Sequence, residues 1–215
     1  LSIVDLSPMG HQPMHSASGR FTICFNGEIY NFEEIRAELE RGGRVPEGGW
    51  RGHSDTEVLL QAFETWGLEP TLNRAVGMFA FALWDARERL LHLVRDRFGE
   101  KPLYYGLVGR DLLFGSELKA LCCHPRFDQP IDRAALRAFA ARTYVPAPLS
   151  IYRGIFKLPG GCYLTLGRSA LSGSLDEPPA EGEGGPFALR RYWSYREVLA
   201  EGLRHPIQSE TEALE

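Results

Sequence analysis

The segment Phe25-Asn-Gly-Glu-Ile-Tyr-Asn31 contains groups that could stabilise a developing negative charge. An Asn amide beside the free backbone N–H of a Gly supplies two donors to one oxyanion, and Gly lets a ligand approach the backbone closely. Asn-Gly is also the strongest short signal for a β-hairpin turn. The two interpretations of Asn26 and Gly27 are compatible, and both are kept as predictions.

A second candidate lies at Ser54-Asp-Thr-Glu57. The spacing predicts a capping box, in which Ser54 accepts from the backbone N–H of Glu57 and the Glu57 carboxylate reaches back to the start of the helix. A capping box does not require Asp55. A carboxylate at a helix start is favoured by the helix dipole, and it is also well placed to accept hydrogen bonds from a substrate ammonium group.

The remaining charged segment and the cysteines give weaker indications of a functional site. Arg95-Asp-Arg-Phe-Gly-Glu-Lys101 places five charges in seven residues, and taken alone it is interpreted as a solvated turn after a buried strand. The four cysteines lack the paired spacing of a zinc site and the density of a disulfide scaffold, so no metal site is predicted and reduced thiols are expected.

Hydrophobic periodicity predicts hairpins and helices around these motifs. A strand over residues 21–25 would turn at Asn26-Gly27 and return over residues 28–30. The further elements are helices over 32–41 and 54–66, hairpins over 78–94 and 103–114, and helices over 116–121 and 132–139. This order indicates an α+β fold, with helices packed against mainly antiparallel sheet.

Composition excludes several classes of partner. The 215 residues, 44% hydrophobic and 24% charged, can bury one substantial core. A net charge of −4 offers no basic field for nucleic acid. No stretch approaches the roughly 20 apolar residues of a membrane-spanning helix. We therefore expect no nucleic acid and no membrane as partner, and a cytoplasmic location.

Eight motifs occur in order between residue 1 and about residue 161. They are Leu1-Ser-Ile-Val-Asp-Leu-Ser7, Gly10-His-Gln-Pro-Met14, Phe25-Asn-Gly-Glu-Ile-Tyr-Asn31, Ser54-Asp-Thr-Glu-Val-Leu-Leu60, Gly77-Met-Phe-Ala-Phe-Ala82, Arg95-Asp-Arg-Phe-Gly-Glu-Lys-Pro-Leu-Tyr-Tyr105, Ser116-Glu-Leu-Lys-Ala-Leu121 and Tyr144-Val-Pro-Ala-Pro148. Together they resemble the glutaminase domain of glutamine-hydrolysing asparagine synthetases, which are class II glutamine amidotransferases. Arg191-Tyr-Trp193 continues the match.

The resemblance implies an N-terminal-nucleophile (αββα) fold, in which two antiparallel sheets lie between helix layers, here missing its first strands. It also implies a reaction. An N-terminal Cys attacks the side-chain amide of glutamine with its own α-amino group as general base, and the resulting thioester is hydrolysed to glutamate. The released ammonia passes to a second domain, which uses ATP and Mg to convert aspartate to asparagine.

Site residues follow from the resemblance position by position. Asn26 and Gly27 match the oxyanion hole, Glu28 and Asp55 match positions that hold glutamine, with Asp55 the partner of its α-ammonium, and Ile3 and Val4 lie in a strand whose backbone lines the pocket. No role is assigned to the matches at 95–105 and 116–121. The loop over residues 42–52 is longer than the family usually has.

The family's nucleophile and the Arg that binds the glutamine carboxylate are expected upstream of Leu1. Cys24 cannot replace that nucleophile, because an internal cysteine has no free amine beside its thiol. We therefore expect residues 1–148 to form an N-terminally truncated glutaminase domain, residues 149–208 a connector with a flexible loop at 169–186, and residues 209–215 the start of a missing synthetase domain. No cofactor is expected in this chain, and a homodimer is left open.

Two other functions remain as alternatives. One is the glutaminase domain of a related amidotransferase that acts on a different acceptor. The other is a non-catalytic module that binds glutamine weakly or not at all.

Overall fold

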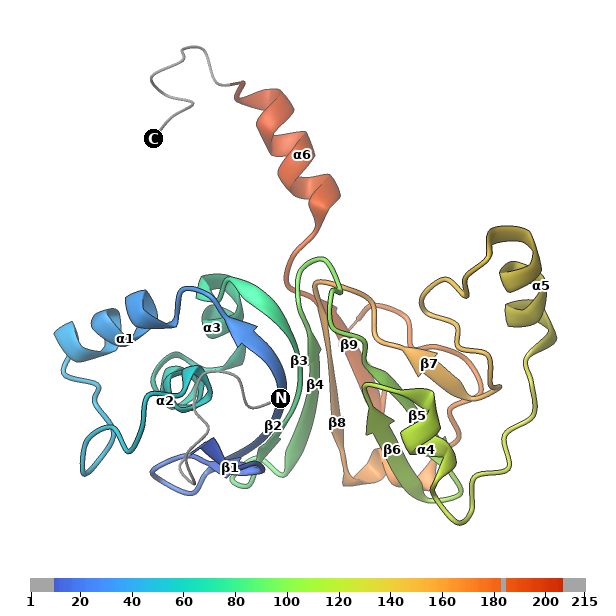
Figure 1. The fold of residues 1–215 in the computed structure, drawn as a ribbon, viewed down its shortest axis with the longest axis horizontal. Coiled ribbons are helices and arrows are strands. Elements are labelled where there is room, and N and C mark those ends of the chain that lie inside the picture. The colour runs from blue at the N-terminus through green and yellow to red at the C-terminus, as the bar shows by residue number, and fades with distance from the viewer. Residues whose placement is uncertain (1–9, 183–184, 207–215) are drawn as a thin grey trace.

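Two antiparallel sheets organise this computed structural model, which describes residues 10–182 and 185–206 (Figure 1). The first sheet has the strand order β1-β2-β3-β4-β8-β9 and the second the order β6-β5-β7. Their bounds are β1 Met14–His15, β2 Phe21–Ile29, β3 Gly77–Asp85, β4 Leu90–Arg95, β5 Tyr104–Val108, β6 Asp111–Gly115, β7 Ile155–Lys157, β8 Cys162–Gly167 and β9 Phe187–Arg191.

Helices cover the outer face of the first sheet, and one short helix packs on the second sheet (Figure 1). The helices are α1 Phe32–Arg41, α2 Asp55–Trp66, α3 Leu68–Arg74, α4 Leu118–Cys122, α5 Arg133–Arg142 and α6 Tyr195–Arg204, with a 3-10 helix, η2, at Arg168–Ser172. None of the helices in the described residues combines the length and the apolar character needed to cross a membrane.

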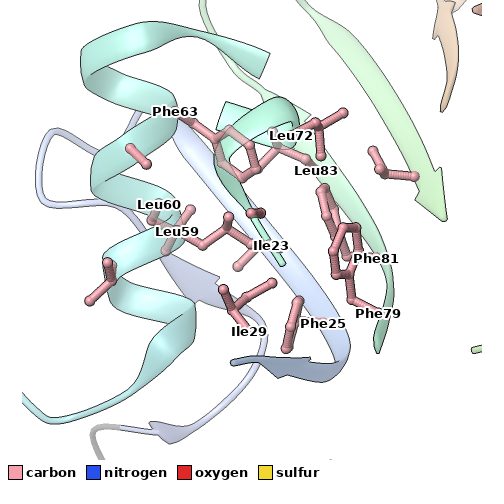
Figure 2. Close-up of a cluster of buried hydrophobic side chains, with 14 of the residues drawn as sticks. Ile23, Phe25, Ile29, Leu59, Leu60, Phe63, Leu72, Phe79, Phe81 and Leu83 are labelled. Atoms are coloured by element: carbon pink, nitrogen blue, oxygen red, sulfur yellow. The ribbon is translucent and has the colours of Figure 1, made fainter. Parts of the chain in front are cut away.

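The largest buried cluster lies between the first sheet and its helices (Figure 2). Phe63 of α2 packs against Phe81 of β3 with ring centroids 5.7 Å apart. Successive strand residues point to opposite faces, so the odd-numbered residues of β2, such as Ile23 and Phe25, enter this cluster. The even-numbered residues face the other way, where Ala80 of β3 belongs to the core between the two sheets.

The expected α+β class with antiparallel sheets is confirmed, and most predicted elements are found. Helix α1 coincides with the prediction for residues 32–41, and the hairpins β3-β4 and β5-β6 lie where periodicity placed them. Strands β7, β8 and β9 come from the segment 149–208 predicted as a connector. Strands β8 and β9 of that segment belong to the first sheet, where β8 lies between β4 and β9, and β7 belongs to the second sheet.

The predicted hairpin turn at Asn26-Gly27 is wrong. Strand β2 continues without a turn through Ile29 and pairs with β3 along its whole length, from Phe21 opposite Asp85 to Ile29 opposite Gly77. Nine residues of pairing and the apolar contacts of β2 with α2 outweigh the local turn preference of an Asn-Gly pair. Gly27 is required for another reason, a close approach between strands.

Candidate functional site

The side chain of Asn26 links the two sheets. Asn26 lies on β2 opposite Ala80, on the face that looks toward the second sheet. Its amide nitrogen Nδ2 donates to Ser116 Oγ at 2.9 Å, and Ser116 directly follows β6. A primary amide has two N–H donors, so Ser116 fixes the orientation of the group while one donor stays available for a ligand.

Gly27 lies where β2 and β3 come unusually close. A Cβ at Gly27 would lie 2.1 Å from the carbonyl oxygen of Met78 and 2.6 Å from the Cα of Phe79. Its φ of +155° is also one that side-chain-bearing residues rarely adopt. Both the space and the backbone conformation therefore require glycine at this position.

The backbone N–H of Gly27 points away from β3. Along an antiparallel strand, residues of the same parity direct their N–H groups to the same side. The N–H of Phe25 donates to Gln12 Oε1 and that of Ile29 to Asp55 Oδ2, so the N–H of Gly27 lies between them on the outer edge of β2. Within residues 10–182 and 185–206 it has no hydrogen-bond partner.

Asp55 is the first residue of α2, and its carboxylate contacts the last residue of β2. Its Oδ2 accepts from the backbone N–H of Ile29 at 3.0 Å and its Oδ1 from the hydroxyl of Thr56 at 3.2 Å. The residue is only 4% exposed, yet no Lys, Arg or His of the described chain forms an ion pair with it. A buried carboxylate normally has a cationic partner, so this acceptor suits a ligand ammonium.

The capping prediction at Ser54 was wrong in its partners. Ser54 Oγ accepts from the backbone N–H of Thr56 at 3.1 Å. The carboxylate of Glu57 accepts from the backbone N–H groups of Arg51 and Gly52, at 2.9 and 3.1 Å. Glu57 therefore orders the loop that precedes Ser54, and the carboxylate of Asp55 bonds β2 instead.

The segment Arg95–Lys101 is a structured support rather than a solvated turn. Asp96 is 1% exposed, and its carboxylate accepts from the N–H groups of Phe79, Glu100 and Lys101 at 3.2, 2.9 and 3.0 Å. The Arg95 guanidinium donates to three backbone carbonyls. Burial lowers the pKa of Arg95. Because Phe79 pairs with Gly27, this segment holds the strand behind the candidate site.

The sequence thus indicated the candidate substrate-binding residues but not the residues that position them. Ser116, Asp96 and Gln12 each lie in a matched motif to which no role was assigned. The only signal was that a polar residue follows or precedes a strand in each case. The side chain of Glu28 shares the face of Asn26, but it forms no hydrogen bond or ion pair with the described residues. Ile3 and Val4 lie outside the described residues.

Cys24 has the wrong environment for a nucleophile. It lies in the middle of β2 opposite Ala82, and burial raises the pKa of its thiol. Reactive cysteines need the opposite shift, because the thiolate is the attacking species. The prediction that Cys24 is a strand residue agrees with this position.

A family model described as a glutamine amidotransferase domain matches residues 1–175. Over 175 residues the chain is 37% identical to "Asparagine synthetase [glutamine-hydrolyzing] 3" of Bacillus subtilis, covering 80% of this chain and 28% of that protein. It is 32% identical to "Amidase chry2" of Gibberella zeae, covering 76% of this chain and 23% of that one.

The chain therefore spans about a quarter of the length of the curated relatives it matches. Among solved structures, glutamine phosphoribosylpyrophosphate amidotransferase of B. subtilis has a TM-score of 0.52 at 19% identity, over 84% of this chain and 31% of that chain. This likeness shows the fold alone. The resemblance inferred from the eight motifs is confirmed by the family match and by the identity to asparagine synthetases. The chain belongs to the glutamine amidotransferase domain family.

Proposed function

We propose that this chain is the glutamine-binding part of a glutaminase that supplies ammonia to an asparagine synthetase. The observation that carries the proposal is the C-terminal half of β2. The oriented amide of Asn26 lies on the face of the strand, the unpaired N–H of the next residue, Gly27, lies at its outer edge, and the carboxylate of Asp55 contacts Ile29, two residues further on. Two neutral donors and one anionic acceptor along one strand match the amide and the α-ammonium of glutamine.

Each residue then has a distinct role. The Nδ2 of Asn26 and the N–H of Gly27 stabilise the oxygen of the tetrahedral intermediate, Asp55 accepts from the α-ammonium, and Glu28 contributes to holding the substrate. The nucleophile is the N-terminal Cys that the family resemblance puts upstream of Leu1, followed by its Arg. The 215-residue chain alone is therefore expected to bind glutamine and not to hydrolyse it.

The acceptor of the ammonia is the finer part of the proposal. Aspartate is proposed because relatives such as the B. subtilis protein are named asparagine synthetases. Because the matched protein of G. zeae is named an amidase and not an asparagine synthetase, the alternative of another acceptor is kept. Among the described residues no group of three or more His, Cys, Asp or Glu could hold a metal ion. ATP and Mg are assigned to the synthetase region because the family resemblance implies it.

Two experiments test the proposal. Calorimetric titration of the chain with glutamine should give binding that Asn26→Ala and Asp55→Asn weaken by about tenfold or more. The complete polypeptide, supplied with glutamine, ATP and aspartate, should form glutamate and asparagine in step. Glutamate release by the 215-residue chain itself, abolished by Asn26→Ala, would refute the account of the nucleophile. Glutamate without asparagine would favour the other acceptor.

A further inference from the structure

Helix α6 presents an apolar face that nothing in the described chain covers. Tyr195, Val198, Leu199 and Leu203 recur at intervals of three and four, which places them on one side of the helix. No residue of α6 is buried, and Leu203 is 75% exposed. Figure 1 shows the helix extending away from both sheets. An isolated helix of ten residues is marginal in water, so this face needs a partner.

The surface continues onto the body of the molecule. Phe98, on the segment that supports β3, is 70% exposed and meets Trp193 edge to face, with ring centroids 4.8 Å apart. A hollow of about 640 Å³ beside this pair is lined in part by Arg97 and Tyr195. We call this continuous patch the α6 surface, and its members are Phe98, Trp193, Tyr195, Val198, Leu199 and Leu203.

The polar side of α6 shows what kind of partner does not fit. Arg204 and His205 both contact Glu201, at 2.8 Å each, and Arg196 and Glu197 carry opposite charges. This side is close to neutral and offers no field to steer an acidic or basic partner. The contact that α6 needs is therefore apolar.

We propose that the α6 surface is the docking surface for the synthetase region of the same polypeptide. The family match ends at residue 175, before α6, and the relatives are about four times as long as their matched part. A partner on the same polypeptide meets α6 at an effective concentration that can approach millimolar, so a small apolar patch suffices. A second copy would have to order the same short helix without that advantage. The inference rests on the proposed function only in requiring that a synthetase region follows.

The test compares thiol accessibility in the complete polypeptide and in the 215-residue chain. Leu203→Cys places a thiol on the apolar face, and Glu197→Cys places a matched control on the opposite, exposed face. Alkylation is followed by mass spectrometry of the peptide that carries each residue, which separates these thiols from the native cysteines. The Leu203→Cys thiol should react about tenfold or more slowly in the complete polypeptide, at every protein concentration, while the control is unchanged.

Two results would overturn the inference. One is equal reactivity of the Leu203→Cys thiol in both proteins. The other is protection that grows with concentration in the 215-residue chain, which would assign the surface to a second copy. Asparagine formation measured on the same preparation reports separately on the proposed function. A complete polypeptide that makes asparagine with an unprotected Leu203→Cys thiol would sink this inference alone.

Discussion

Replacing Gly27 with alanine tests whether the close approach of β2 and β3 is essential to the site. The added Cβ would lie 2.1 Å from the carbonyl oxygen of Met78, whereas ordinary contact begins at 3.4 Å. The strands would have to separate locally by about 1.3 Å, the difference of these two values. That shift would move the N–H of Gly27 relative to the amide of Asn26, since both belong to β2.

The expected loss of stability has two sources. Forcing a methyl group into a packed region costs about 1–3 kcal/mol, and holding a side-chain-bearing residue at φ +155° costs about 1–3 kcal/mol more. Together they destabilise the fold by about 4 kcal/mol. In a chain of this size each kcal/mol lowers the melting temperature by roughly 2–4 °C, so a decrease of roughly 8–16 °C is predicted.

Gly19→Ala is the matched control. Gly19 has φ +72°, but a Cβ there meets nothing within 4 Å. The control therefore carries a backbone cost of about 1–2 kcal/mol and no steric cost. Urea unfolding followed by tryptophan fluorescence, with thermal melts followed by circular dichroism, measures both variants. If Gly27→Ala loses no more stability than Gly19→Ala, the close strand approach does not constrain this position and the reasoning fails.

The other predictions concern ligand binding and pH. Asp55→Asn should keep the fold, because an amide oxygen can still accept from the N–H of Ile29, but should weaken glutamine binding about tenfold or more in calorimetry. In the complete polypeptide, Asn26→Ala should lower kcat for glutamine hydrolysis by about 10²–10³, and Ser116→Ala by about tenfold with KM nearly unchanged; equal effects on KM would contradict a positioning role. Burial lowers the pKa of His92 to about 4 from an ordinary value of 6.5. As the pH drops, the unfolded chain binds a proton at His92 at a higher pH than the folded chain does. The free energy of unfolding therefore falls by up to about 3 kcal/mol between pH 6.5 and pH 4. Urea titrations at several pH values measure this fall, and the His92→Gln variant should lack it.

Elements with a strong period could be predicted from the sequence, because burial alone sets their pattern. Helix α1 and the hairpin β3-β4 are examples, with bounds at or near the predicted ones. The end of β2 could not be predicted, because the Asn-Gly pair is a local signal and the pairing of β2 with β3 joins residues about 50 positions apart in sequence. A distant strand decided the conformation, and no short window contains that information.

The candidate site shows the same division. Asn26, Gly27 and Asp55 could be singled out because their residue types suit a definite chemistry. Their support could not, since Asn26 and Ser116 are separated by 90 positions. Asn31 shows the same effect. It directly precedes α1, where Asn often caps a helix, but its side chain donates to the carbonyl of Arg74 and accepts from the N–H of Val76 instead.

The backbone of Phe79 connects the segment that supports the site with the candidate site itself. Asp96 forms hydrogen bonds with both backbone groups of Phe79. The Asp96 carboxylate accepts from the N–H of Phe79, and the backbone N–H of Asp96 donates to the carbonyl of Phe79 at 2.8 Å. Phe79 thus directs its hydrogen bonds away from β2. Its partner Gly27 must then direct its own N–H to the opposite, outer edge. The charged segment that looked like a solvated turn therefore helps to set the direction of the donor on which the proposed oxyanion hole depends.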